Sequence, residues 1–241
     1  MKRYISTLIG IGAAITLPAS AALIVDTSAV GGVPSGQDLK YFTFNDSSLT
    51  IPGSGSWTTL STDNLESISV VVAPNGKAVT GAKDGEYAAP VLSGGQGSNF
   101  GNQPNGTDST IYLTSGTTGG NGSIRLTFAE PKLYLGLLWG SVDDYNTLSF
   151  YDSNNVKLGE IGGSDVTPSA TGDQSASGTY YVNINSDTPF SYVVATSTQF
   201  AFEFDNVAVS AKNVSVPDGG STLALTGLGL GLLGLIRRKI A

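Results

Sequence analysis

"LYLGLLWGSVDDYNTLSFYD", residues Leu133 to Asp152, decides the fold class of this chain. Its first part places apolar residues at every second position, at Leu133, Leu135, Leu137 and Trp139. The segment "TLSFY" that follows is short and rich in aromatic residues. Alternation with a period of two predicts half-buried β-strands, because successive side chains of a strand point to opposite faces. We therefore expect two strands here, with Trp139 in the core rather than on a sugar-binding surface.

The same pattern recurs on both sides of this stretch. "SISVVV" (67–72) and "SIRLTF" (123–128) alternate in the same way, and Asn-Gly dipeptides suited to tight turns lie between such runs. About ten short strands with turns of this kind predict an all-β fold, an antiparallel β-sandwich that is jelly-roll-like. The segment from Leu92 to Ser109 is rich in Gly, Asn and Ser, and we expect it to form a long surface loop.

One strand carries an irregularity. In "QFAFEFDNVAVS" (199–210) the apolar positions change parity across Asp205 and Asn206. A one-residue slip would turn the following valines to solvent, so the pattern predicts a β-bulge or a switch between sheets. Bulges often re-aim a side chain, which makes Asp205 a candidate cation ligand. The alternative is a polar pair that caps a bend.

Composition excludes several classes of function. The chain has no cysteine and no histidine, which removes histidine-based triads and the usual zinc sites. Five of the twelve basic residues lie at the two ends, which leaves seven against nineteen acidic residues in the body, a net charge of −12. A surface this acidic repels phosphate backbones, so we expect no nucleic-acid partner.

The N-terminus predicts a secretory signal peptide over residues 1–21. Lys2 and Arg3 precede a short apolar core that ends at Pro18, and Ala19 and Ala21 form the small-x-small pattern of a cleavage site. The core is too short for a membrane anchor. We expect signal peptidase to cut after Ala21, and a single β-sandwich domain to occupy residues 22–212.

The chain ends in "VPDGGSTLALTGLGLGLLGLIRRKIA", residues 216–241. A linker (213–221) precedes an uncharged apolar stretch (222–236), about 22 Å long as a helix against about 30 Å of hydrocarbon. The stretch is nonpolar on every side, which argues against a buried core helix. Snorkelling of the adjacent arginines can close the gap, so the pattern predicts one transmembrane helix. By the positive-inside rule, the tail 237–241 with Arg237, Arg238 and Lys239 is cytoplasmic and the body lies outside.

This C-terminus resembles the sorting signal of exosortase-dependent bacterial proteins, the PEP-CTERM group, in its VPD variant. The resemblance implies that exosortase, a membrane protease, recognises Val216, Pro217 and Asp218. Pro217, Gly219 and Gly220 would keep the motif extended and open to a protease. A softer resemblance links 133–152 and "FEFDNVAV" to the jelly-roll bodies of such surface proteins, and it implies a fold without an activity.

Candidate ligand-binding residues are few. Asp143, Asp144 and Asn146, between the two strands of the opening stretch, offer oxygens to Ca²⁺, although the polar turn needs no metal. Tyr145 and Trp57 are candidates for stacking on a sugar ring. We expect no catalytic residues and no cofactor, with Ca²⁺ as the one open exception.

These features predict an exported, non-enzymatic protein of the cell surface or extracellular matrix, sorted by an exosortase and held briefly at the inner membrane. The alternative is a carbohydrate-binding module with a structural calcium, and the third hypothesis is an uncharacterised glycoside hydrolase. Extracellular polysaccharide is the expected partner of the body beside exosortase and signal peptidase.

Overall fold

The computed structural model describes residues 20–36, 38–45, 58–60, 68–73, 75–116 and 121–215. Ala19, Trp57, the sorting motif 216–220, the apolar stretch 222–236 and the basic tail lie outside these residues. The regular secondary structure of the described chain is antiparallel β-strand, apart from the four-residue helix α1 (Gly163–Val166) and a 3-10 turn (Ala176–Gly178). The all-β prediction is confirmed. Within the described chain, no helix has the length and apolar character that a membrane span requires.

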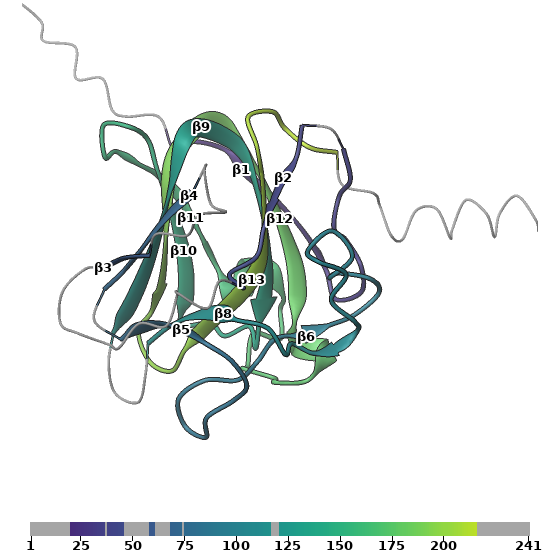
Figure 1. Ribbon diagram of the computed structural model, residues 1–241. Coiled ribbons are helices and arrows are strands. Elements are labelled where there is room, and N and C mark those ends of the chain that lie inside the picture. Colours follow the sequence, from purple (N-terminus) through teal and green to yellow (C-terminus); the bar gives the residue numbers. More distant parts are fainter. Residues whose placement is uncertain are drawn as a thin grey trace, which may run out of the picture.

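Two long strands organise the fold. β9 (Gly122–Gly140) and β12 (Tyr180–Ser197) pair with each other along most of their length, and both bend near the middle. The pairing loses its register between Asn185 and Tyr192 of β12, opposite the exposed residues 129–131 of β9. Each bend contains a proline, which has no N–H for the ladder. Figure 1 shows β9 curving over the top of the molecule. The bends fold one continuous sheet into two facing layers.

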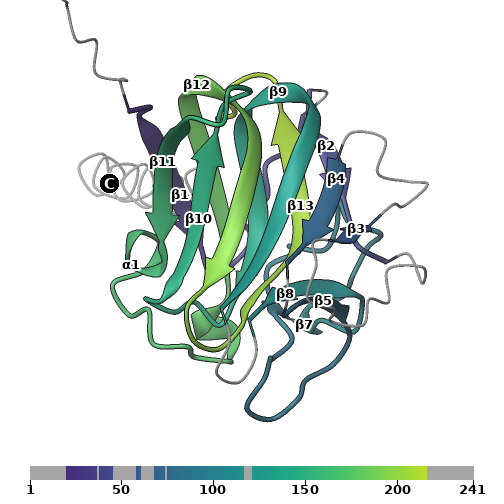
Figure 2. The ribbon, with the colours of Figure 1, turned by 90° about the vertical axis from the view of Figure 1, so that its left-hand side faces the viewer.

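The first layer consists of the halves of β9 and β12 on one side of the bend, together with the strands that pair with them. Its order is β3 (Thr58–Leu60), β4 (Ile68–Val72), the first half of β9, the second half of β12, β10 (Asn146–Tyr151) and β11 (Lys157–Gly162). Figure 2 shows this layer face-on, with β11, β10, β12, β9 and β4 in turn across it. Both strands predicted in the opening stretch are present, as the end of β9 and as β10.

The second layer lies beyond the bend. Its order is β1 (Leu23–Ser28), the first half of β12, the second half of β9 and β13 (Phe202–Ser210). On its other edge, β13 pairs with β8 (Tyr112–Ser115) near the start of β13 and with β2 (Lys40–Phe42) near its end. β8 pairs in turn with β5 (Gly76–Val79). A short pair, β6 (Val91–Leu92) and β7 (Gly106–Thr107), stands apart. Every strand pairing among the described residues is antiparallel, as a sandwich of this type requires.

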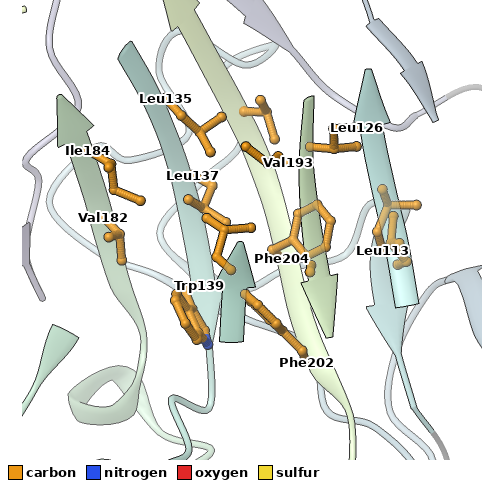
Figure 3. Close-up of a cluster of buried hydrophobic side chains, with 14 of the residues drawn as sticks. Leu113, Leu126, Leu135, Leu137, Trp139, Val182, Ile184, Val193, Phe202 and Phe204 are labelled. Atoms are coloured by element: carbon orange, nitrogen blue, oxygen red, sulfur yellow. The ribbon is translucent and has the colours of Figure 1, made fainter. Parts of the chain in front are cut away.

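The main hydrophobic core fills the space between the layers. Leu126 and Val193 come from the first layer, and Leu135, Leu137 and Phe204 face them from the second (Figure 3). Trp139 is fully buried and stacks on Phe202, with ring centroids 4.1 Å apart. Its predicted place in the core is confirmed. Each such buried side chain stabilises the fold by roughly 1.5–3 kcal/mol relative to an exposed position.

A second hydrophobic cluster covers the outer face of the second layer. Tyr134, Leu138 and Tyr181 leave the sheet on that side and pack against Leu92 and Phe100. The prediction of a plain surface loop from Leu92 to Ser109 is therefore wrong in part, since Phe100 is only 1% exposed. The loop crosses an apolar sheet face and must seal it from water.

Candidate functional site

A cleft of about 280 Å³ opens at the end of the second layer where β9 and β13 meet. Four segments line it, namely 82–87, 141–145, 171–174 and 200–203. The lining therefore comes from the turn after β9, the start of β13 and two loops, 82–87 and 171–174, that lie elsewhere in the sequence. Four carboxyl groups belong to its lining, those of Asp84, Glu86, Asp143 and Glu203, and the last two come from the turn after β9 and from β13.

Glu203 lies on β13 and is 2% exposed. Its Oε1 accepts the Ala88 N–H at 3.0 Å, and its Oε2 accepts the Ser141 hydroxyl at 2.7 Å. Burial raises the pKa of Glu203 to about 7, while the two donors act in the opposite direction and the charge of Asp143 raises it further. Both carboxyl oxygens are therefore engaged by the protein itself.

Asp143 is held by the excursion that contains α1. The Val142 N–H donates to the Gly178 carbonyl at 2.9 Å, and the Gly172 N–H donates to the Val142 carbonyl at 3.0 Å. These bonds fix the backbone on the N-terminal side of Asp143. Burial raises the pKa of Asp143, a hydrogen bond from Tyr145 lowers it, and the neighbouring Asp144 raises it.

Aromatic rings border the same cleft. Tyr145 is half-buried, and Phe200 is 47% exposed. Tyr87 also lines the cleft, beside Glu86, which pairs with Lys83 and with Lys77 at 3.2 Å. Aromatic rings next to carboxylates combine the two features that a hydroxyl-rich ligand needs, a stacking surface and hydrogen-bond acceptors.

The residues predicted as calcium ligands near the cleft have three different environments. Asp143 is buried in the lining, Asp144 is exposed, and Asn146 is buried with its Nδ2 donating to the Ala201 carbonyl at 3.2 Å. Among the residues that the structure describes, no three carboxylates form a metal-binding group.

Ala21 belongs to the predicted cleavage site of the signal peptide. It packs against the main core, and its N–H donates to the Leu158 carbonyl.

Asp205 lies in a separate polar cluster under the 93–110 loop. The register of β13 shifts after Asp205, and Asn206 has a positive φ of 53°, so the predicted bulge is confirmed. Gln103 reaches Asp205 from the loop, and Asp108 lies beside Asp205. Sequence reasoning did not identify Gln103, Asp108 or Glu203, because no local pattern links them to the residues that they contact.

Comparison with known families places a sorting signal at the end of the chain. Residues 215–240 match the VPDSG-CTERM motif, a PEP-CTERM-like exosortase sorting signal. The match confirms the resemblance drawn from Val216 to Asp218 and the residues that follow. The motif implies processing by an exosortase and suggests an exported protein of the cell surface.

The body has weaker likenesses. No curated protein matches this chain. Among solved structures, it is similar to a mutant of a family 29 carbohydrate-binding module made to probe ligand recognition. The identity is 12% and the TM-score 0.30, over 63% of this chain and 99% of that one. A likeness at this level carries no argument about function.

Proposed function

We propose that this chain is a surface protein that an exosortase processes at its C-terminal signal, and that its β-sandwich then serves as a non-enzymatic structural or adhesive part of the cell surface or matrix. The sorting motif supports the processing step. Contacts at the C-terminal end of the β-sandwich support the idea that the sandwich stays folded after the cut.

Val214, one residue before the motif match begins, is fixed to the body by hydrogen bonds and packing. The Val214 N–H donates to Asn185 Oδ1 at 2.8 Å, and Asn185 Nδ2 donates to the Val214 carbonyl at 2.9 Å. Val214 also packs against the second hydrophobic cluster. The match to the motif starts at Ser215. A cut within 216–220 therefore removes none of the contacts that the structure describes in the body. This observation carries the proposal.

The processing step is tested by replacing Pro217 and Asp218 together with alanine. We expect a precursor that stays in the membrane fraction and keeps its basic tail, because the protease loses the residues that it recognises. Mass spectrometry of the C-terminus measures this directly. Lys212→Ala is the matched control, since Lys212 is exposed and lies outside the motif. A double variant with the same mature C-terminus as the wild type would refute the proposal.

A second candidate function is the binding of a neutral or weakly charged polysaccharide in the cleft. Tyr145 and Phe200 provide ring faces, and Asp143 provides an acceptor beside them. Glu203, in the same lining, accepts one hydrogen bond at each carboxyl oxygen, which holds its side chain in a fixed position.

Affinity electrophoresis in gels that contain polysaccharide tests the second candidate. We expect retardation of the wild type and a loss of about tenfold or more in affinity for Phe200→Ala or Tyr145→Ala, in line with roughly 1.4 kcal/mol per stacked ring. Val156→Ala is the control, because Val156 is similarly exposed but lies outside the cleft. Equal mobility of all four proteins in every gel would exclude this function for the polysaccharides tested.

A further inference from the structure

Two carboxyl groups are buried together on the outer face of the second layer. Asp205 is fully buried on β13, and Asp108, on the loop above it, is 2% exposed. The Thr110 hydroxyl lies 2.6 Å from Asp108 Oδ1 and 3.4 Å from Asp205 Oδ2, so the two carboxyl groups are neighbours. The ion pairs of Lys77, Lys83, Lys157 and Lys212 all use other carboxylates. Burying charge without an opposite charge is costly, so this pair needs an explanation.

The bulge in β13 aims two consecutive side chains at the same place. Phe204 and Val207 both belong to the main core, so Asp205 and Asn206 between them both leave the sheet on its outer face. Gln103 contacts each of them. Its Nε2 donates to Asp205 Oδ2 at 3.4 Å, and its Oε1 accepts from Asn206 Nδ2 at 2.6 Å. The side chains of Asp205 and Asn206 thus converge beneath the loop.

Three oxygens of this cluster have no hydrogen-bond partner. They are Asp108 Oδ2, Asp205 Oδ1 and Asn206 Oδ1, and they make up three of the seven unpartnered buried side-chain polar atoms of the described chain. The other carboxyl oxygens are engaged, since Thr110 donates its hydroxyl to Asp108 Oδ1 at 2.6 Å and Gln103 donates to Asp205 Oδ2. An unsatisfied buried acceptor costs roughly 1–3 kcal/mol. The three acceptors belong to side chains of one buried cluster, connected through Gln103 and Thr110, and a bound cation would satisfy them.

We propose that Asp108, Asp205 and Asn206 bind a calcium ion through these three oxygens. Two carboxylates and a divalent cation balance in charge, and carboxylate and amide oxygens are the hard ligands that Ca²⁺ takes at 2.3–2.6 Å. Thr110 is half-buried, so the cluster lies near enough to solvent for water to complete the six to eight ligands. Zinc and copper are disfavoured, because the site has no sulfur or imidazole ligand.

The ion would have a structural role. It would join β13 to the 93–110 loop at the point where the loop covers the second hydrophobic cluster. The cleft lies nearby, because Glu203 is two residues before Asp205 and its side chain leaves the sheet on the same face, at a separation of roughly 7 Å. Calcium binding is independent of the sorting signal, so either proposal can fail without the other.

Thermal unfolding of the full-length chain, stripped of metal with a chelator and then titrated with CaCl₂, tests the site. We expect Tm to rise by about 5–10 °C at a free calcium concentration one hundred times Kd. Asp205→Asn and Asp108→Asn keep the shape of each side chain and remove one charge, and each should abolish most of this rise. Asp144→Asn is the matched control, because Asp144 is an exposed carboxylate outside the cluster, and it should keep the full rise.

A direct binding measurement covers the case in which a variant fails to fold. Tb³⁺ luminescence excited through tyrosine should appear with a stoichiometry of one, because the Tyr181 hydroxyl donates to the Asn206 carbonyl at 3.2 Å and lies beside the site. Excess Ca²⁺ should quench the signal by competition. Calorimetry that finds no bound calcium in the wild type would overturn the proposal and assign a shared proton to the carboxyl pair. A Tm response lost in Asp144→Asn and kept in Asp205→Asn would overturn it as well, and would move the ion to the 143–146 turn.

Discussion

At the scale of single residues, the position of Asp143 depends on neighbours that have no side chain. A Cβ on Gly163 would lie 2.0 Å from the Asp143 carbonyl oxygen, and a Cβ on Gly172 would lie 2.5 Å from Asp143 Oδ1. Gly172 also has a positive φ of 73°. These glycines let the 163–172 excursion pass directly over Asp143. The geometry of the cleft is thus set partly by residues that take no part in its chemistry.

Gly172→Ala tests this close approach. We expect a loss of about 2–4 kcal/mol in the free energy of unfolding, because the new methyl group meets the carboxylate and the backbone also has to keep a positive φ. Gly81→Ala is the matched control. Gly81 has a similar φ of 69° with nothing within 4 Å of an added Cβ, so it should lose only about 1 kcal/mol. Urea denaturation measures both values.

The two variants separate backbone strain from the steric clash. Asp143→Ala in the Gly172→Ala background should recover part of the loss, since it removes the carboxylate that the methyl group meets. Equal losses for Gly172→Ala and Gly81→Ala would show that the contact with Asp143 has no energetic weight.

At the scale of elements, the second half of β9 is buried on both faces. Leu137 points into the main core, while its neighbour Leu138 points into the second cluster beneath the 93–110 loop. Strands of an antiparallel sandwich are commonly buried on one face only. Here the loop acts as a third layer over part of the sheet. The outer face of β9 therefore contributes to stability as the inner face does.

Alanine substitution on the two faces of β9 tests this equivalence. We expect Leu137→Ala and Leu138→Ala each to lower the free energy of unfolding by about 2–5 kcal/mol, because both leave a cavity in a packed cluster. Ile24→Ala on β1 is the control, since Ile24 is 67% exposed and should lose less than about 0.5 kcal/mol. A Leu138→Ala loss close to that of Ile24→Ala would mean that the loop does not seal this face in solution.

At the scale of the whole molecule, the two bent strands make the body one unit. β9 and β12 each contribute to both layers, so neither layer can unfold alone without breaking a strand that the other needs. Near the end of the described residues, a pair of hydrogen bonds joins Asn185 and Val214. Val214 is thus held to the folded body one residue before the match to the sorting signal begins.

Truncation on either side of this boundary gives a testable difference. A chain that ends at Ser215 should unfold at nearly the same temperature as the full-length chain. A chain that ends at Lys212 loses both hydrogen bonds and the packing of Val214, about 1–3 kcal/mol, and should unfold about 2–10 °C lower. Differential scanning calorimetry of the two chains measures the difference. Equal Tm values for both truncated chains would show that Val214 does not close the fold.

Part of the candidate sites was predictable from sequence. The bulge at Asp205 follows from a change of parity within one strand, and the burial of Trp139 follows from its place in an alternating run. The partners of these residues do not follow from such patterns. Gln103 and Asp205 are separated by 102 positions, as the hydrogen bond between them shows. Glu203 falls on a polar position of its strand, where solvent exposure is the ordinary expectation, and it is buried because segments distant in sequence, among them Ala88 and Ser141, pack over it.

By itself, the sequence determined the secondary-structure class, the bulge in β13 and the sorting signal at 215–240. Each of these depends on residues that are neighbours along the chain, so their order alone carries the information. Tertiary structure alone decided which polar residues are buried, where the cleft opens and which oxygens remain without a donor. Those properties depend on two sheet layers and a covering loop coming together, and hydrophobic burial drives that assembly without regard to distance along the chain.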